Sequence, residues 1–467
     1  MKLKQLANTY ESLLDTEVIV HGWILSVRTQ KDITFIKLND GTNAKGVQLI
    51  VTEPIIDCNI GTSIRAVGKL VRSPAKEQPY EIQANNITIL GRTDIEMYPL
   101  AKGKLPMDYL RRYAHLRART SSFGSIFRIK SAISEATHLF FKDRGFLHIN
   151  PNIITVNECE GGAGVFQVTE HDISDYSKLP AIKSVSTNGL TSKHDWTRDH
   201  FDRPAFLTVS SQLQLEAIAC SLGSVYTTNK SFRSEHSTTN KHLSEFEHLE
   251  IEDTFTTLEE LMQIGEDYIK MVGKYILEHN MEDVENLGKF VSKGLLERIN
   301  SIVNPLENKP FKRLPYTDAI EILQKASGLS KPAVFGDDLS SEFENYLTDY
   351  FKGPVFVYNW PSSIKSFYMK QLDNKLCENF DLLMPYKVGE LIGGSMREDN
   401  LDKMLEVMKV KGVSPEPLDF YLDLRRFGSV PHGGFGLGLD RMCMMFTGME
   451  SIKDVVAFPV HFKNCNY

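Results

Sequence analysis

The chain has 467 residues, 42% of them hydrophobic, and a formal net charge of −7. This length exceeds one ordinary core, so two or three domains are expected. The negative charge argues against a protein that simply coats nucleic acid, because phosphate binding favours a positive surface. The six cysteines lack metal-ligand spacing, so reduced thiols and no structural zinc are expected. The sequence has no apolar run of signal-peptide or membrane-span type, which favours a cytoplasmic protein.

Five short strands are predicted between Glu17 and Leu90, separated by Gly, Asn and Pro. Strands of this length and spacing are typical of a small Greek-key barrel of the oligonucleotide-binding type. Phe35 lies in the second strand, close to Ile33 and Ile36. The pattern leaves two interpretations of this ring open, a core aromatic or an exposed platform on which an unpaired base stacks.

A hinge is expected over residues 97–124, which contain two prolines and many basic residues. From Ser125 an amphipathic helix is predicted, because apolar residues recur at helical spacing until Gly145. Residues 157–168 hold three glycines near Glu160, and residues 171–202 are polar and aperiodic. The second stretch is expected to form a loop insertion.

The central stretch, Ser231–Glu252, predicts an antiparallel hairpin. Side chains two apart share a strand face, so Phe246, His248, Glu250 and Glu252 point together, while Leu249 faces the other way. A solvated hairpin would show the same alternation. One face is therefore expected to be apolar and the other to carry acids, an aromatic ring and a histidine.

Two later segments suggest a nucleotide site. Asp381 and Glu390 flank a predicted strand turn, and two carboxylates that face one pocket suit Mg²⁺, although paired acids near a turn are often merely solvated. Gly434, Gly436 and Gly438 fall on one side of a predicted strand, and the helix that follows is predicted to begin at Asp440 and Arg441. A strand face without side chains can accept a flat nucleoside, although close strand packing would also need these glycines.

These segments together resemble class II aminoacyl-tRNA synthetases. FRSE with HLSEF is similar to motif 2 of that family, GGFGLGLDR to motif 3, and the helix and strand after Ser125 to motif 1. The resemblance covers nearly the whole chain and is nearest to the asparaginyl branch of the aspartyl, asparaginyl and lysyl subgroup. It implies an α+β fold, with an antiparallel catalytic sheet flanked by helices and an N-terminal five-stranded OB-type β-barrel.

The resemblance also implies a domain order and an assembly. Residues 1–96 would form an OB-fold anticodon-binding domain, residues 97–124 a hinge, and residues 125–467 the catalytic domain with its 171–202 insertion. Motif 1 builds the dimer interface in this family, so a homodimer is expected. The partners implied are L-asparagine, ATP with Mg²⁺, and tRNA(Asn), with no DNA and no membrane.

The resemblance assigns roles residue by residue. Arg233, Arg441 and Glu390 would be catalytic, and Asp381 and Glu390 would hold the metal. The nucleotide would be bound by Arg233, Glu235, Lys241, His242, Leu243, Phe246, Gly438 and Arg441. The amino acid would be bound by Glu160, Ser210, Gln212, Glu216, Glu250 and Arg397. The anticodon would be bound by Arg28, Phe35, Gln48 and Glu81.

The prediction of which amino acid is bound depends on the sequence QLQLE, residues 212–216. Aspartyl enzymes carry a lysine where this chain has Leu215, and that lysine pairs with the substrate carboxylate. Glu216 would instead accept a hydrogen bond from an amide NH₂, and Arg397 would donate to the amide oxygen. Glu216 could also be only an acid favoured near a helix N-terminus.

Three alternative functions remain open at this point. The first is an aspartyl-tRNA synthetase, and the second is an asparagine synthetase on the same catalytic domain, disfavoured by the barrel. The third is an inactive tRNA-binding paralogue, disfavoured because a pure binder has no use for Arg233, Glu390 and Arg441.

Overall fold

The computed structural model describes residues 1–52, 58–75, 78–101, 103, 105–157, 164–186, 189–303, 309–372 and 375–467. These residues form two compact units. The first contains Met1–Ile133, Tyr275–Ile299 and Phe446–Phe458, and the second contains Ser134–Lys274, Asn300–Met445 and Pro459–Tyr467. In the described part of the chain, no helix is long and apolar enough to cross a membrane.

The first unit contains a closed five-stranded barrel, as predicted. Its strands pair in the order β1-β2-β3-β5-β4. Alternate side chains point inward, so Ile36 and Leu38 are fully buried while Lys37 between them is not. The strands are β1 (Glu17–Gln30), β2 (Ile33–Asn39), β3 (Val47–Val51), β4 (Ser63–Arg72) and β5 (Tyr80–Gly91), with α1 (Leu3–Leu13) packed on the barrel core.

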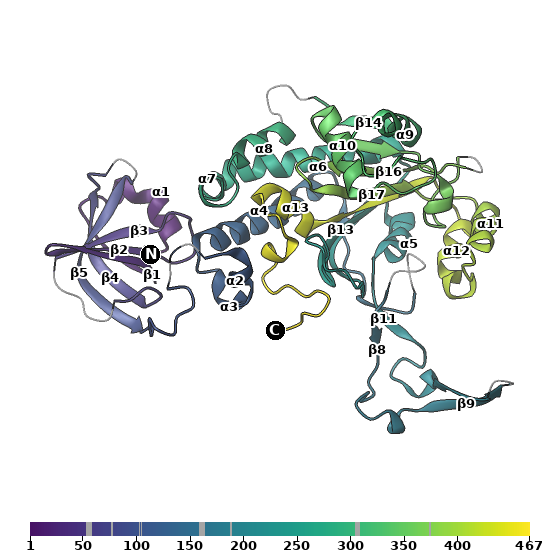
Figure 1. Ribbon diagram of the computed structural model, residues 1–467, viewed down its shortest axis with the longest axis horizontal. Helices are drawn as coiled ribbons and strands as arrows, with labels where there is room; N and C mark the ends of the chain where they lie inside the picture. Colours follow the sequence, from purple (N-terminus) through teal and green to yellow (C-terminus); the bar gives the residue numbers. More distant parts are fainter. Residues whose placement is uncertain are drawn as a thin grey trace. The chain divides into compact units, whose positions relative to one another are not determined.

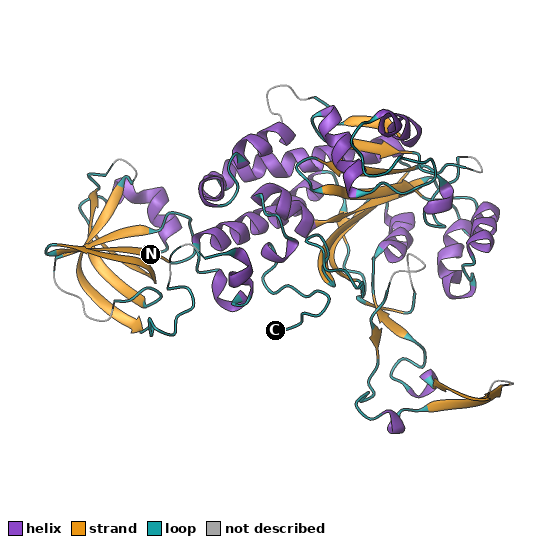
Figure 2. Cartoon of the chain, viewed as in Figure 1, coloured by secondary structure: helices purple, strands orange, loops and turns teal. Residues whose placement is uncertain are grey.

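The second unit is built on an eight-stranded sheet (Figures 1 and 2). Neighbours within the central run β15 to β12 are antiparallel, as predicted, whereas both edge strands, β14 and β6, pair in parallel. In sheet order the strands are β14 (Lys312–Pro315), β15 (Val355–Tyr358), β16 (Asn379–Met384), β17 (Gly389–Met396), β18 (His432–Gly438), β13 (Glu245–Thr254), β12 (Val225–Phe232) and β6 (Leu147–His148). The prediction of an α+β fold is confirmed.

Helices cover the sheet because each presents an apolar stripe. A core between α9, α10 and strands β14 to β16 contains Tyr316, Phe343 and Trp360. The helix α6 begins with a capping box, in which Thr257 and Glu260 exchange hydrogen bonds of 2.9 and 3.3 Å. The helices are α2 (Met107–Arg111), α3 (Ala114–Arg117), α4 (Ser121–Asp143), α5 (Gln212–Leu222), α6 (Leu258–His279), α7 (Met281–Phe290), α8 (Leu295–Val303), α9 (Tyr316–Lys325), α10 (Ser341–Phe351), α11 (Leu401–Lys411), α12 (Asp419–Arg426) and α13 (Leu439–Thr447), with 3₁₀ turns η3 (Ser362–Ile364), η4 (Glu416–Leu418) and η5 (Ile452–Asp454).

The predicted hairpin exists, but its first strand begins and ends earlier than expected. The strand β12 pairs with β13 from Val225 opposite Glu252 to Phe232 opposite Glu245. Arg233 and Glu235 therefore lie in the connecting segment, beyond the strand. A segment free of sheet pairing can carry both residues away from the sheet plane.

Residues 171–202 were expected to form a loop insertion, and the described part of this insertion also contains regular structure. The segment contains a two-stranded sheet, in which Ser186 pairs with Gly189 and Ala181 with His194. It leaves the unit between β8 and β11, which pair with each other. An Asn-Gly pair at 188–189, a strong hairpin signal, was the available clue. The elements are β7 (Ile154–Thr155), β8 (Gln167–Val168), η1 (Tyr176–Lys178), β9 (Ala181–Ser186), β10 (Gly189–His194), η2 (Trp196–Arg198) and β11 (Ala205–Leu207).

Candidate active site

A polar cavity of about 240 Å³ opens on the eight-stranded sheet of the second unit. Its wall combines one end of α5 with the middle of β13, β16, β17 and β18. Of the residues predicted for the site, the cavity is lined by Ser210, Gln212, Arg233, Glu250, Asp381, Glu390 and Arg397. Segments separated by more than 100 residues therefore converge, as the family resemblance implied.

One end of the cavity is an anionic pocket built around Glu250. The Ser210 hydroxyl donates to Oε1 of Glu250, and the backbone N–H of Ser211 donates to Oε2 at 2.9 Å. Gln212 lines the same part of the cavity. A buried carboxylate with a hydroxyl and an amide beside it is suited to an ammonium group.

A neighbouring part of the wall carries a buried arginine and glutamate, since Glu252 lies two residues from Glu250 on β13. Arg397 and Glu252 are 3% and 1% exposed, and the guanidinium binds both carboxylate oxygens, with Nε 3.2 Å from Oε2. Burial raises the pKa of Glu252 to about 8, and nearby Glu216 adds to the rise, while Arg397 opposes it. The sequence placed Glu252 on the correct face of the hairpin but assigned it no role.

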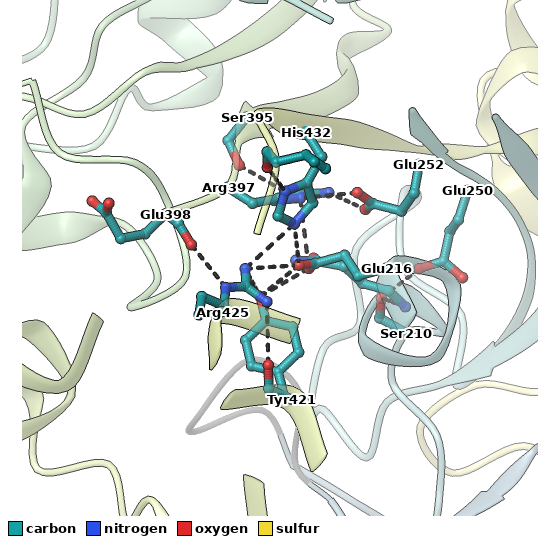
Figure 3. A network of polar contacts seen from close by, with 12 residues as sticks. Ser210, Glu216, Glu250, Glu252, Ser395, Arg397, Glu398, Tyr421, Arg425 and His432 are labelled. Atoms are coloured by element: carbon teal, nitrogen blue, oxygen red, sulfur yellow. Dashed lines mark hydrogen bonds and ion pairs between the residues drawn. The ribbon is translucent and has the colours of Figure 1, made fainter. Parts of the chain in front are cut away.

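Glu216 does not line the cavity, contrary to the predicted contact with the substrate. Its carboxylate is 0% exposed and accepts hydrogen bonds from Tyr421 at 2.8 Å and Arg425 at 3.0 Å (Figure 3). The side-chain amide of Gln212 also donates to it, at 3.0 Å. The physical reason is that four side chains, those of Gln212, Tyr421, Arg425 and His432, enclose its two oxygens. Glu216 therefore lies behind the cavity wall and keeps residues of that wall in position.

The nucleotide side of the site is formed by the segment after β12 and by the start of α13. The guanidinium carbon of Arg233 lies 5.6 Å from the centre of the Phe246 ring. Arg441 donates from Nη1 to the backbone oxygen of Glu390. These contacts place both arginines beside groups predicted for the nucleotide.

The other predicted nucleotide residues lie on the segment between β12 and β13. The His242 ring lies 3.1 Å from the Ser237 hydroxyl, and burial lowers the pKa of both His242 and Lys241. Glu235 is half-buried and acts electrostatically on His242. Leu243 is buried and does not line the cavity.

The glycines of β18 leave less space for a nucleoside than the sequence suggested. A Cβ at Gly434 would collide with the backbone oxygen of Ile251, and one at Gly436 would lie 2.6 Å from the His248 ring. At Gly438 the nearest atom would be 3.7 Å away. Close strand packing therefore explains Gly434 and Gly436, whereas a Cβ at Gly438 would make only an ordinary contact with Arg441.

Two predicted metal ligands converge at β16 and β17. A Cβ added at Gly393 would lie 3.2 Å from Glu390 Oε1 and 3.6 Å from Asp381 Oδ1, so both carboxylates flank this glycine. Lys365 binds Asp381 at 2.7 Å. Burial raises the pKa of Glu344 to about 7, and the charge of Glu390 adds to the rise. Carboxylate oxygens at one cavity edge fit the donor set of Mg²⁺.

The four residues predicted for the anticodon lie on the barrel of the first unit. Arg28 pairs with Phe35 across β1 and β2, and Gln48 donates to Glu81 at 3.5 Å. Phe35 is only half-buried, whereas neighbouring Ile36 is fully buried in the barrel core. The interpretation of Phe35 as a core aromatic is therefore wrong, because it occupies the outer face of its strand.

Glu160 lies outside the described residues. Sequence reasoning missed Lys365, Glu344 and the Tyr421, Arg425 and His432 group around Glu216. Only YLDLRRFGSVPH, before the glycine strand, pointed toward that group, through its density of charged and aromatic residues.

Comparisons with known proteins agree with this geometry. Residues 106–461 match the model of class II tRNA synthetases (D, K and N), and residues 18–90 match that of the OB-fold nucleic acid binding domain. The chain is 41% identical to the asparagine–tRNA ligase of Protochlamydia amoebophila over 98% of each chain, and 42% identical to that of Treponema denticola over 94% of each.

A solved structure supports the same assignment. The asparaginyl-tRNA synthetase of Pyrococcus horikoshii, complexed with asparaginyl-adenylate, superimposes with a TM-score of 0.82 at 28% identity, covering 97% of both chains. The predicted resemblance is confirmed. The chain belongs to the class II tRNA synthetases of the D, K and N group and, within that group, to the asparagine–tRNA ligases.

Proposed function

We propose that the chain activates L-asparagine with ATP and transfers the asparaginyl group to tRNA(Asn). The observation that carries the proposal is the cavity itself. The cavity is lined by Glu250 with Ser210, by Arg397 with Glu252, and by Arg233 with the Asp381 and Glu390 carboxylates. This set provides complementary groups for an ammonium, an amide and a phosphate-linked carboxylate.

In the first step, a carboxylate oxygen of asparagine attacks the α-phosphorus of ATP, and pyrophosphate leaves. Arg233 bridges the carboxylate and the α-phosphate, because a planar fork of donors suits two adjacent anionic groups. Glu250, Ser210 and Gln212 hold the α-ammonium group. Phe246 and Arg441 hold the adenine between a ring and a guanidinium. Catalysis then depends on positioning and charge stabilisation, without a covalent enzyme intermediate.

Asp381 and Glu390 are the residues that would hold Mg²⁺, which when bound offsets phosphate charge. The chain's own contribution there is to keep both carboxylates at the cavity edge, with Lys365 fixing Asp381. In the second step, a hydroxyl of the terminal adenosine of the tRNA attacks the carbonyl carbon of the adenylate, which forms the ester and releases AMP.

Arg397 is the group best placed to recognise the substrate side chain, since it lines the cavity and Glu252 fixes its orientation. An arginine donates to the amide oxygen of asparagine, and a carboxylate accepts from its NH₂. Glu252 is the cavity-lining acid beside Arg397, so we assign acceptance of the NH₂ to Glu252 and a positioning role to Glu216.

The remaining parts of the proposal concern domains and assembly. Residues 1–96 bind the anticodon through Arg28, Phe35, Gln48 and Glu81, residues 97–124 are the hinge, and residues 125–467 form the catalytic domain. The chain works as a homodimer in the cytoplasm, where tRNA and ATP are available. Support for the dimer comes from β6, an edge strand of the sheet, where Leu147 is 48% exposed.

Pyrophosphate exchange with each of the twenty amino acids, with and without tRNA, tests the proposal. Asparagine should be the activated amino acid, preferred over aspartate by at least about 100-fold, since a buried polar wall left unpaired penalises the wrong side chain. Equal activation of aspartate would overturn the choice of substrate, and exchange with no amino acid would overturn the enzymatic function.

A further inference from the structure

Residues 169–186 and 189–202, which lie between β8 and β11, form an arm of the second unit (Figure 1). Figure 1 shows its hairpin strand β9 at the far end from β8 and β11. His171 lies where the chain enters the arm, and His194 and Asp199 lie where it returns. None of the three belongs to the cavity described above.

These three side chains offer metal-ligand atoms close together. One ring nitrogen from each histidine and one carboxylate oxygen of Asp199 all lie within 4.8 Å of one another. The His194 Nε2 and Asp199 Oδ2 atoms are 3.3 Å apart. Zinc bonds of about 2.0–2.2 Å in a tetrahedral arrangement hold two ligand atoms roughly 3.3–3.5 Å apart, so this pair already has the required spacing.

Surrounding groups orient the proposed ligands. The Thr169 hydroxyl donates to Asp199 Oδ2 at 2.6 Å, and the backbone N–H groups of Glu170 and His200 donate to Oδ1 at 3.1 and 2.7 Å. The Nε2 atom of His171 lies 3.0 Å from the backbone oxygen of Arg198, an arrangement that leaves Nδ1 with its lone pair. Metal-binding histidines commonly donate their second ring N–H to such a carbonyl.

We propose that His171, His194 and Asp199 bind one divalent transition-metal ion of the zinc type, which ties the entering and returning segments of the arm together. Two imidazoles and one carboxylate suit zinc, whereas Mg²⁺ favours oxygen ligands alone. Water occupies the fourth position. The expectation of no structural zinc rested on cysteine spacing, and this site contains no cysteine.

The test uses the full chain, freed of metal with a chelator and titrated with Zn²⁺ by calorimetry and with Co²⁺ by visible absorption. The parent should take up one zinc ion per chain, and its cobalt form should lack thiolate charge-transfer absorption. His194→Gln and Asp199→Asn should each weaken zinc binding by about 100-fold, and Thr169→Val by about tenfold, because it removes only an orienting hydrogen bond.

His200→Gln is the matched control, since His200 is exposed, lies in the same arm and pairs with Glu170 instead. It should bind zinc like the parent. Pyrophosphate exchange should be unchanged in all four variants, because none touches the cavity. Zinc should slow proteolysis of the arm in the parent but not in His194→Gln.

Three results would overturn the site. One is a parent that takes up no stoichiometric zinc at micromolar concentration, which would leave His194 and Asp199 as an ordinary hydrogen-bonded pair. Another is equal zinc affinity in the parent, His194→Gln and Asp199→Asn. The last is a cobalt spectrum with thiolate charge transfer, which would assign the metal to cysteine. The zinc titration of the parent tests the proposal by itself, even if a variant folds poorly.

Discussion

Arg425 donates from Nη2 to Oε2 of Glu216 at 3.0 Å, with both side chains fully buried. The same oxygen lies 3.1 Å from Nε2 of His432, and Arg397 Nε lies 3.7 Å from the other oxygen. Burial alone would raise the pKa of Glu216, but Arg425 and its neighbours hold it far below its usual range. The negative charge of Glu216 thus lies beside two buried arginines, Arg425 and Arg397. Of these two, Arg397 lines the cavity.

Glu216→Gln should lower both stability and asparagine activation. Removing one partner of a buried ion pair leaves uncompensated charge and typically costs about 3–5 kcal/mol. Chemical denaturation and kcat/KM for asparagine and aspartate measure the two effects. Tyr421→Phe is the control, because it removes one hydrogen bond to Glu216 but leaves the charge, and it should cost only about 1.5–3 kcal/mol. Parental stability in Glu216→Gln would contradict the positioning role.

Arg233→Ala should abolish pyrophosphate exchange with the fold intact, because it removes a charge-assisted contact that forms with the reacting phosphate. Arg233→Lys should recover little, since an ammonium cannot bind two groups in one plane. Arg426→Ala is the matched control, because Arg426 pairs with Asp419 and Asp423 on α12 and does not line the cavity. Exchange within about threefold of the parent in Arg233→Ala would refute the catalytic assignment.

Phe35→Ala should weaken aminoacylation while leaving pyrophosphate exchange unchanged. Loss of one base stack costs about 1–3 kcal/mol of tRNA binding, and the barrel takes no part in adenylate formation. Phe35→Trp should retain tRNA binding, because an indole also stacks. Ile36→Ala provides the contrast, since a buried core deletion should lower the melting temperature instead. A parallel fall of both reaction steps in Phe35→Ala would count against a tRNA contact.

Stability and Mg²⁺ binding should depend on pH through Glu344. Burial raises its pKa from 4.5 to about 7, so between these values the folded state keeps a proton that the unfolded state has lost. The free energy of unfolding should therefore fall as pH rises through this window. Asp381 and Glu252 contribute to the same fall, because burial raises their pKa to about 7 and about 8. Glu344→Gln should therefore reduce the fall without removing it, while Glu321→Gln, which changes an exposed partner of Lys325, should leave it unchanged. The measurement is urea unfolding at intervals from pH 4.5 to 8.

The same proton should compete with Mg²⁺, because a cation near Glu390 favours ionised neighbouring carboxylates. The rise in melting temperature caused by Mg²⁺ should be larger at pH 8 than at pH 6 in the parent. An equal rise at both pH values would exclude coupling between Glu344 and the metal.

Leu147→Glu should break the proposed dimer. Leu147 lies on the edge strand β6, and a charge there opposes strand pairing and apolar contact between copies. Light scattering should give twice 53.0 kDa for the parent and about that single mass for the variant. Val410→Glu is the control, because Val410 is 81% exposed on α11. A parent that scatters as a monomer would refute the dimer.

The sequence by itself determined the elements whose signals are local. The barrel strands, the capping box at Thr257 and the hairpin face of Glu250 and Glu252 all follow from periodicities of two or 3.6 residues and from capping chemistry. The sequence also indicated the family, because FRSE and GGFGLGLDR each combine particular residue types at fixed spacing within one stretch of chain.

Only the tertiary structure decided where individual side chains point. Glu216 became a buried anchor because Arg425 and His432, more than 200 residues away, fold against it and satisfy its oxygens. Likewise, Gly434 and Gly436 serve strand packing because β13 brings Ile251 and His248 beside them. His171 meets His194 and Asp199 only because the arm turns back on itself. Sequence spacing sets which residues share a local face, whereas contacts between distant segments depend on how the whole chain packs.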